Sequence, residues 1–127
     1  MGGDAFRLSE GSVYDFCMKF SEKAAPIIDR LAEELLSEEV VMTDATTVTV
    51  DGKQEYIRNF SSAGTAVYFC MDSRSIKKMG ELPFPGRYTG TLVHDHETAM
   101  YHFGTGHGEC NVHLIRYLRK NSEDTCK

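Results

Sequence analysis

The chain has 127 residues, of which 41% are hydrophobic and 26% charged, and this balance excludes a disordered or fibrous protein. Its length supports one buried core, so we expect a single domain over residues 1–127. With 14 basic and 19 acidic residues the net charge is −5, which disfavours strong binding of the isolated chain to DNA, a polyanion that proteins usually hold with clustered Lys and Arg. The sequence contains no secretory signal, no apolar run of membrane-spanning length and no CxxC pair among its four cysteines, so we expect a cytoplasmic protein with reduced thiols and no membrane partner.

The first predicted element is a long helical segment over residues 12–37. Ser12 has the spacing of an N-cap, with an acidic residue, Asp15, three positions later. Apolar residues then recur at steps of three and four, which predicts one continuous stripe packed on a partner surface. Pro26 indicates either a kink or two helices that meet there, and the unbroken stripe favours the kink.

Three strands in an antiparallel meander are predicted next. The run VVMTDATTVTV at 40–50 is rich in β-branched residues and ends at Asp51-Gly52, a typical two-residue hairpin turn. The runs QEYIRNF (54–60) and TAVYFCM (65–71) follow, and the second is apolar enough to predict a buried strand.

The remaining pattern predicts a helix, a strand and a final helix. SRSIKKMGEL (73–82) is a short helix, and YTGTLVHD (88–95) is a fourth strand. GTGHGE (104–109) lacks the spacing of a phosphate-binding loop and is interpreted as a flexible loop. The final helix, 108–121, should turn three apolar residues inward: Val112, Ile115 and Leu118. The predicted order is therefore a helix followed by βββαβα, which is an α/β fold.

Two aspartates are the main candidates for chemistry. Asp44 lies within a predicted strand, where an aspartate is disfavoured, and Asp95 ends the fourth strand. If the two strands are neighbours, both carboxylates could hold Mg²⁺, which supports phosphodiester chemistry by activating an attacking water or hydroxyl. In the alternative interpretation Asp44 faces solvent or bonds to nearby threonines, and Asp95 only forms a turn.

A zinc site is a second hypothesis. Cys110 and His113 stand one helical turn apart, and His107 with His94 or His96 could complete a tetrahedral set. The sequence has no second CxxC or HxxxH half, so Cys110 and His113 could equally be scaffold residues.

Three segments together resemble the catalytic core of the insertion sequence 66 family of bacterial transposases. They are VVMTDATTV, GTLVHDHETAMYHF and CNVHLIRYL, and the resemblance covers residues 40–121. It implies a partial ribonuclease H-like fold, with Asp44 and Asp95 as catalytic Mg²⁺ (or Mn²⁺) ligands of the Asp-Asp-Glu class. Cys110, His113 and Arg116 match a Cys-Asn-x-His-x-x-Arg segment that is expected to be structural in that family.

The resemblance also implies that catalysis and DNA binding need parts of a longer protein. The family cuts DNA at transposon ends and then joins the freed 3′ hydroxyl to target DNA, and its third carboxylate lies beyond the Cys-x-x-His segment. Glu123 and Asp124 are misplaced to substitute for it, so we expect a fragment that is inactive alone. Transposon-end DNA would be bound by the full-length protein. A zinc-stabilised module and a catalytically dead interaction domain remain alternatives, and self-association is expected through an open sheet edge or the first helix.

Overall fold

The computed structural model describes residues 8–125 and divides the chain into two compact units, one up to Arg30 and one from Leu31 onward. Each unit is described by itself. None of the helices within the described residues is long and apolar enough to cross a membrane.

Helix α1 spans Glu10–Leu36 and continues without interruption through Pro26, so the two-helix alternative is wrong. It begins two residues before the predicted start: the Ser9 hydroxyl oxygen accepts a hydrogen bond from the Ser12 backbone N–H at 3.1 Å, as an N-cap does. Within residues 10–30 most of the predicted stripe is exposed, including Phe16 and Phe20, whereas Ala24 and Ile28 are half-buried.

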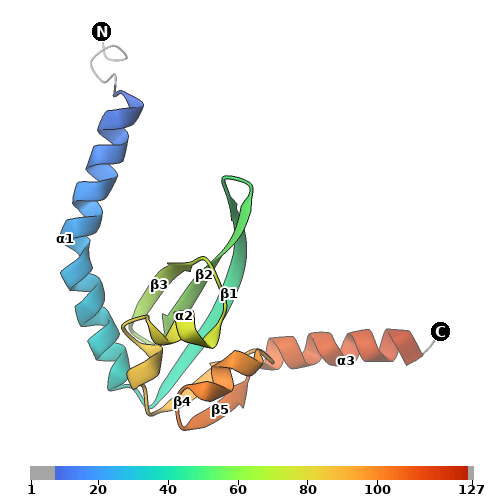
Figure 1. The fold of residues 1–127 in the computed structure, drawn as a ribbon. Coiled ribbons are helices and arrows are strands. Elements are labelled where there is room, and N and C mark those ends of the chain that lie inside the picture. The colour runs from blue at the N-terminus through green and yellow to red at the C-terminus, as the bar shows by residue number, and fades with distance from the viewer. Residues whose placement is uncertain (1–7, 126–127) are drawn as a thin grey trace. The chain divides into compact units, whose positions relative to one another are not determined.

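The second unit is built on a five-stranded sheet with the order β3-β2-β1-β4-β5 (Figure 1). The strands are β1 (Val40–Val50), β2 (Lys53–Ser61), β3 (Ala66–Met71), β4 (Thr91–His94) and β5 (Gly106–Glu109). β1, β2 and β3 pair antiparallel, whereas β4 pairs parallel with both β1 and β5. This mixed sheet, with β1 at its centre, confirms the α/β class and agrees with a ribonuclease H-like fold.

The hairpin between β1 and β2 turns at the predicted position. Asp51 and Gly52 have φ angles of 49° and 76°, so both adopt the left-handed conformation that a two-residue hairpin turn of the primed type requires. The prediction from the Asp-Gly pair is confirmed.

Further helices complete the unit. They are α2 (Ile76–Gly80), the 3₁₀ helices η1 (Pro85–Arg87) and η2 (Thr98–His102), and α3 (Asn111–Thr125). The Ser75 hydroxyl caps α2 by accepting from the backbone N–H of Lys78. The predicted helix at 73–82 is thus confirmed, although it is shorter than expected.

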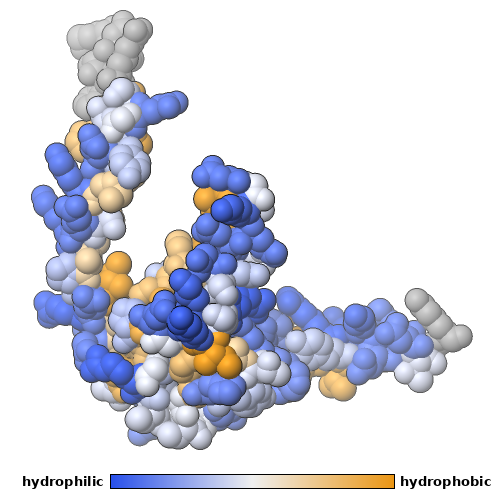
Figure 2. Space-filling model, in the orientation of Figure 1, coloured by the Kyte–Doolittle hydropathy of each residue, from blue (hydrophilic) through white to orange (hydrophobic). Residues whose placement is uncertain are grey.

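Three sequence predictions are wrong. The segment predicted as a flexible loop contains strand β5, because its backbone pairs with β4 over four residues. Strand β3 lies at an edge of the sheet, and its Tyr68 and Cys70 are exposed rather than buried. The three apolar residues predicted on the inner side of the last helix, Val112, Ile115 and Leu118, are all exposed on α3, and hydrophilic side chains dominate the visible face of that helix (Figure 2).

The core lies on one face of the sheet. Val41 of β1, Phe60 of β2 and Leu92 of β4 are fully buried there, and Phe84, which precedes η1, packs on Phe60 with ring centroids 4.8 Å apart. Since side chains alternate along a strand, the neighbouring positions of β1 lie on the opposite face. Val40, Met42 and Asp44 are exposed, so this second face is accessible.

Candidate functional site

The parallel pairing of β1 and β4 brings the two candidate aspartates together. Met42 is the register partner of Val93. Two residues further along, Asp44 lies in β1 and Asp95 lies directly after the end of β4, on the same face of the sheet. A carboxylate oxygen of each and a ring nitrogen of His113 lie within 4.8 Å of one another. These three side chains are a set that could hold a metal ion.

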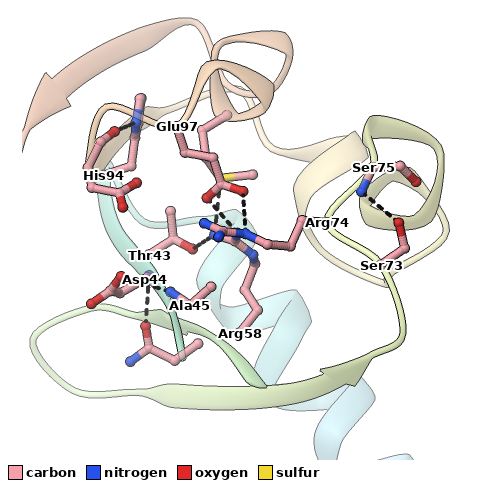
Figure 3. A network of polar contacts seen from close by, with 12 residues as sticks. Thr43, Asp44, Ala45, Arg58, Ser73, Arg74, Ser75, His94 and Glu97 are labelled. Carbon is pink, nitrogen blue, oxygen red and sulfur yellow. Dashed lines mark hydrogen bonds and ion pairs between the residues drawn. The ribbon is translucent and has the colours of Figure 1, made fainter. Parts of the chain in front are cut away.

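The Asp44 side chain is held by the backbone beside it. Its Oδ1 accepts a hydrogen bond from the backbone N–H of Ala45 at 2.8 Å. The backbone N–H of Asp44 donates to Asn59 Oδ1 of β2 at 3.1 Å (Figure 3). One oxygen is therefore anchored while Asp44 as a whole stays exposed. An exposed carboxylate with one free oxygen can bind a cation or a water molecule.

His113 comes from the first turn of α3, which is fixed to the end of β4. The backbone N–H of Cys110 donates to the His94 carbonyl at 2.8 Å, and α3 begins at the next residue. Cys110 and His113 also line a pocket of about 190 Å³ together with Asp44 and Asn59. The Cys-x-x-His segment, predicted as scaffold, thus contributes its histidine to the aspartate cluster.

Hydrogen bonds from α3 lower the pKa of the Cys110 thiol below its ordinary value. The first cause is the side chain of His113, and the next are the backbone N–H groups of His113 and Val112, which outweigh the opposing effect of burial. A helix N-terminus favours a thiolate because its free N–H groups point at the sulfur.

A buried ion pair lies on the other side of the same strands (Figure 3). Arg58 of β2, only 1% exposed, donates to Glu97 Oε2 at 2.6 Å and to Thr43 Oγ1 at 3.2 Å. Arg74 donates to the second Glu97 oxygen at 3.2 Å. Burial opposes the ionised carboxylate, but these hydrogen bonds more than offset it, so the pKa of Glu97 lies below its ordinary value. The segment that follows Asp95 is consequently tied to β1 and β2.

The upstream histidines of the zinc hypothesis bond to one another and to Glu109 rather than forming a zinc set. His94 Nε2 lies 3.1 Å from His107 Nδ1, and burial, followed by the charge on His94, lowers the pKa of His107. His96 Nδ1 lies 2.7 Å from Glu109 Oε1, which also accepts from the Tyr101 hydroxyl. Within residues 8–125, the aspartates with His113 are the one group whose ligand atoms converge. The zinc hypothesis therefore has no converged set of ligands in the described part of the chain.

Arg116, the last residue of the matched segment, is exposed on α3. Sequence reasoning missed the Arg58–Glu97 pair, although an arginine inside a strand pattern that is otherwise apolar at alternate positions was an available signal.

The fold and the cluster together define a class, a ribonuclease H-like domain with one carboxylate on its first strand and a second directly after its fourth. The sequence model of the family described as "Transposase IS66 family" matches residues 2–126. The chain belongs to this family, which supports a transposase-type function. No curated protein and no solved structure matches the chain.

Proposed function

We propose that this chain carries part of the catalytic centre of a transposase, in which Asp44 and Asp95 bind Mg²⁺ for cutting and joining DNA strands. The observation that carries the proposal is the convergence of both carboxylates on the accessible face of the sheet. Carboxylate oxygens are the ligands that Mg²⁺ prefers. The bound ion would supply activation of an attacking water or 3′ hydroxyl and would stabilise the leaving oxygen.

The protein groups would hold and orient the reacting parts. The hydrogen bond from the Ala45 N–H leaves one Asp44 oxygen free toward the cation, and the Arg58–Glu97 pair fixes the backbone that follows Asp95. Because Asp44 is exposed, a polynucleotide phosphate could reach the cluster without an opening motion.

We further propose that the isolated chain is inactive or nearly so. Within residues 8–125 the third member of the cluster is a histidine and not a third carboxylate. The net charge of −5 opposes the approach of DNA, so binding to transposon ends would depend on the full-length protein. Cleavage of duplex DNA by the purified chain would overturn this part of the proposal.

A Mn²⁺ titration followed by NMR tests the site itself. Paramagnetic broadening should be centred on Asp44 and Asp95 and should disappear in Asp44→Asn and in Asp95→Asn. Asp51→Asn is the matched control, because it removes the same charge from the hairpin turn, where asparagine tolerates a positive φ. Broadening that persists in both site variants would overturn the proposal. Metal analysis of the purified protein should find no stoichiometric zinc, and a full equivalent would favour the zinc-stabilised module.

A further inference from the structure

We propose that His113 is a third protein ligand of the cation site, and that this nitrogen donor makes the site prefer Mn²⁺ to Mg²⁺. The inference rests on the proposed function, because it assumes that Asp44 and Asp95 bind a cation. It goes further by assigning a role to His113 and a preference to the site.

The position of His113 is fixed by the fold. The Cys110 N–H bonds to the carbonyl of His94, the residue before Asp95, and the Leu114 N–H bonds to the Cys110 carbonyl at 3.1 Å to form the first turn of α3. His113 lies on that turn, so its ring is carried toward the aspartates by backbone hydrogen bonds. The ring therefore needs no large movement to reach a shared cation.

One ring atom of His113 lacks a partner. Its Nδ1 is buried and makes no hydrogen bond to any residue of the described chain. Buried polar atoms in folded proteins are nearly always satisfied, so this nitrogen calls for a partner, and a ring nitrogen of His113 lies within 4.8 Å of both carboxylates. A cation shared with the aspartates would bring the imidazole into a complete coordination sphere.

Cys110 is suited to orient the ring. Cys110 and His113 line the same pocket, and the His113 side chain lowers the pKa of the Cys110 thiol, so the two groups are neighbours. An imidazole that donates one N–H keeps the lone pair of its other nitrogen available, and such a partner to a metal-binding histidine fixes its tautomer and orientation.

The mixed donor set determines the expected preference. Carboxylate and water oxygens suit both Mg²⁺ and Mn²⁺, whereas imidazole is a ligand of transition metals, a class that includes Mn²⁺ but not Mg²⁺. Two aspartates alone would discriminate little between Mg²⁺ and Mn²⁺. Adding the nitrogen of His113 should strengthen binding of Mn²⁺ more than binding of Mg²⁺.

The test measures Mn²⁺ affinity by calorimetry and Mg²⁺ affinity by competition, on the wild-type chain, His113→Ala and Asp44→Asn. His102→Gln is the control, because His102 is an exposed histidine outside the cluster. His113→Ala should weaken Mn²⁺ binding by about tenfold or more, in line with the losses seen when groups that support a metal ligand are removed. Mg²⁺ binding should change much less, so the ratio of the two affinities should fall.

A second measurement uses the wild-type protein and needs no folded variant. Pulsed electron paramagnetic resonance of the Mn²⁺ complex should detect coupling to an imidazole ¹⁴N nucleus. The role of His113 would be overturned by an absent ¹⁴N coupling, or by an unchanged affinity ratio in a folded His113→Ala variant. If Asp44→Asn still abolished Mn²⁺ binding in that case, the proposed function would stand. Mn²⁺ binding that survived Asp44→Asn would instead overturn the proposed function beneath it.

Discussion

The pKa of the Cys110 thiol is set in part by its neighbour His113. The hydrogen bond from the His113 side chain is the largest cause of the lowered pKa of the thiol. His113→Ala should therefore raise the pKa of Cys110 toward its ordinary value of 9.0. The rate of alkylation by iodoacetamide against pH measures this, in a chain whose other three cysteines are replaced by serine. An unchanged rate profile would contradict the hydrogen bond.

Arg58 and Glu97 form an ion pair, and the loss of one partner should lower the free energy of unfolding. Removing one partner of a buried ion pair leaves the other charge buried without compensation, so Glu97→Gln should lower the free energy of unfolding by about 3 kcal/mol. Urea denaturation measures the loss. Glu33→Gln is the matched control. Both side chains of the Arg87–Glu33 pair are exposed, so this pair should contribute less than about 1 kcal/mol to the free energy of unfolding.

The same carboxylate gives a defined dependence of stability on pH. The pKa of Glu97 is lower in the folded chain than its ordinary value of 4.5, so the folded state binds fewer protons than the unfolded state in this range. Its stabilising effect is complete above about pH 4.5 and is lost as the pH falls through the lower, folded pKa. Below pH 4.5 the free energy of unfolding should therefore drop more steeply in the wild-type chain than in Glu97→Gln. Parallel curves would show that Glu97 is not responsible.

At the scale of single residues, the sequence predicted which residues are candidates for the site better than it predicted which residues they contact. Asp44 stood out because aspartate is disfavoured inside a strand, and Asp95 because site residues gather at the C-terminal ends of strands in α/β sheets. The contribution of His113 depends on where α3 begins, and the pairing of Arg58 with Glu97 joins segments that are far apart in the chain. A local pattern can mark Arg58 as unusual, but it does not identify Glu97 as the partner or show which residues His113 will meet.

Among the elements, the start of β4 depends on a close approach at Gly90. A Cβ atom at this position would lie 2.8 Å from the Glu39 carbonyl oxygen and would also collide with the Tyr88 ring. Tyr88 is buried and donates a hydrogen bond to the Glu38 carbonyl, so it cannot move away cheaply. Gly90→Ala should therefore cost about 2 kcal/mol of unfolding free energy.

Gly64 provides the comparison for that variant. No atom lies within 4 Å of a Cβ placed there, so Gly64→Ala should leave the urea midpoint nearly unchanged. Because Gly90 lies at the entrance to the strand that ends beside Asp95, Gly90→Ala should also weaken Mn²⁺ binding, whereas Gly64→Ala should not. Equal midpoints for the two variants would contradict the close approach.

Strands β1 and β2 could be predicted because β-branched residues and the Asp-Gly turn act locally. Strand β5 could not, because the sequence Gly-His-Gly-Glu has no strand propensity and pairs only where β4 offers its free edge. A Cβ at Gly106 would lie 2.6 Å from Thr91 Oγ1, so the packing of β5 against β4 requires a glycine there. The same glycine weakens the strand pattern in the sequence.

For the whole molecule, the exposed apolar residues predict self-association. Residues 10–30 of α1 carry exposed Val13, Phe16 and Phe20 at helical spacing, and such a stripe typically packs against another helix. Sedimentation velocity over a wide concentration range should show a reversible oligomer, and Phe16→Glu with Phe20→Glu should convert it to a monomer. Lys19→Gln with Lys23→Gln is the matched control, because it shifts the net charge of the same helix by the same amount. A wild-type monomer at every concentration would refute the prediction.

The parallel pairing of β1 and β4 also has a kinetic consequence. Parallel neighbours need a long crossover connection, and contacts between distant segments form slowly because the loop between them must close first. The β1–β2 hairpin can fold locally, but Asp44 and Asp95 become neighbours only when the crossover is complete. A cation that needs both carboxylates thus binds only to chains that have finished folding. By mass action, its binding would raise the free energy of unfolding of those chains.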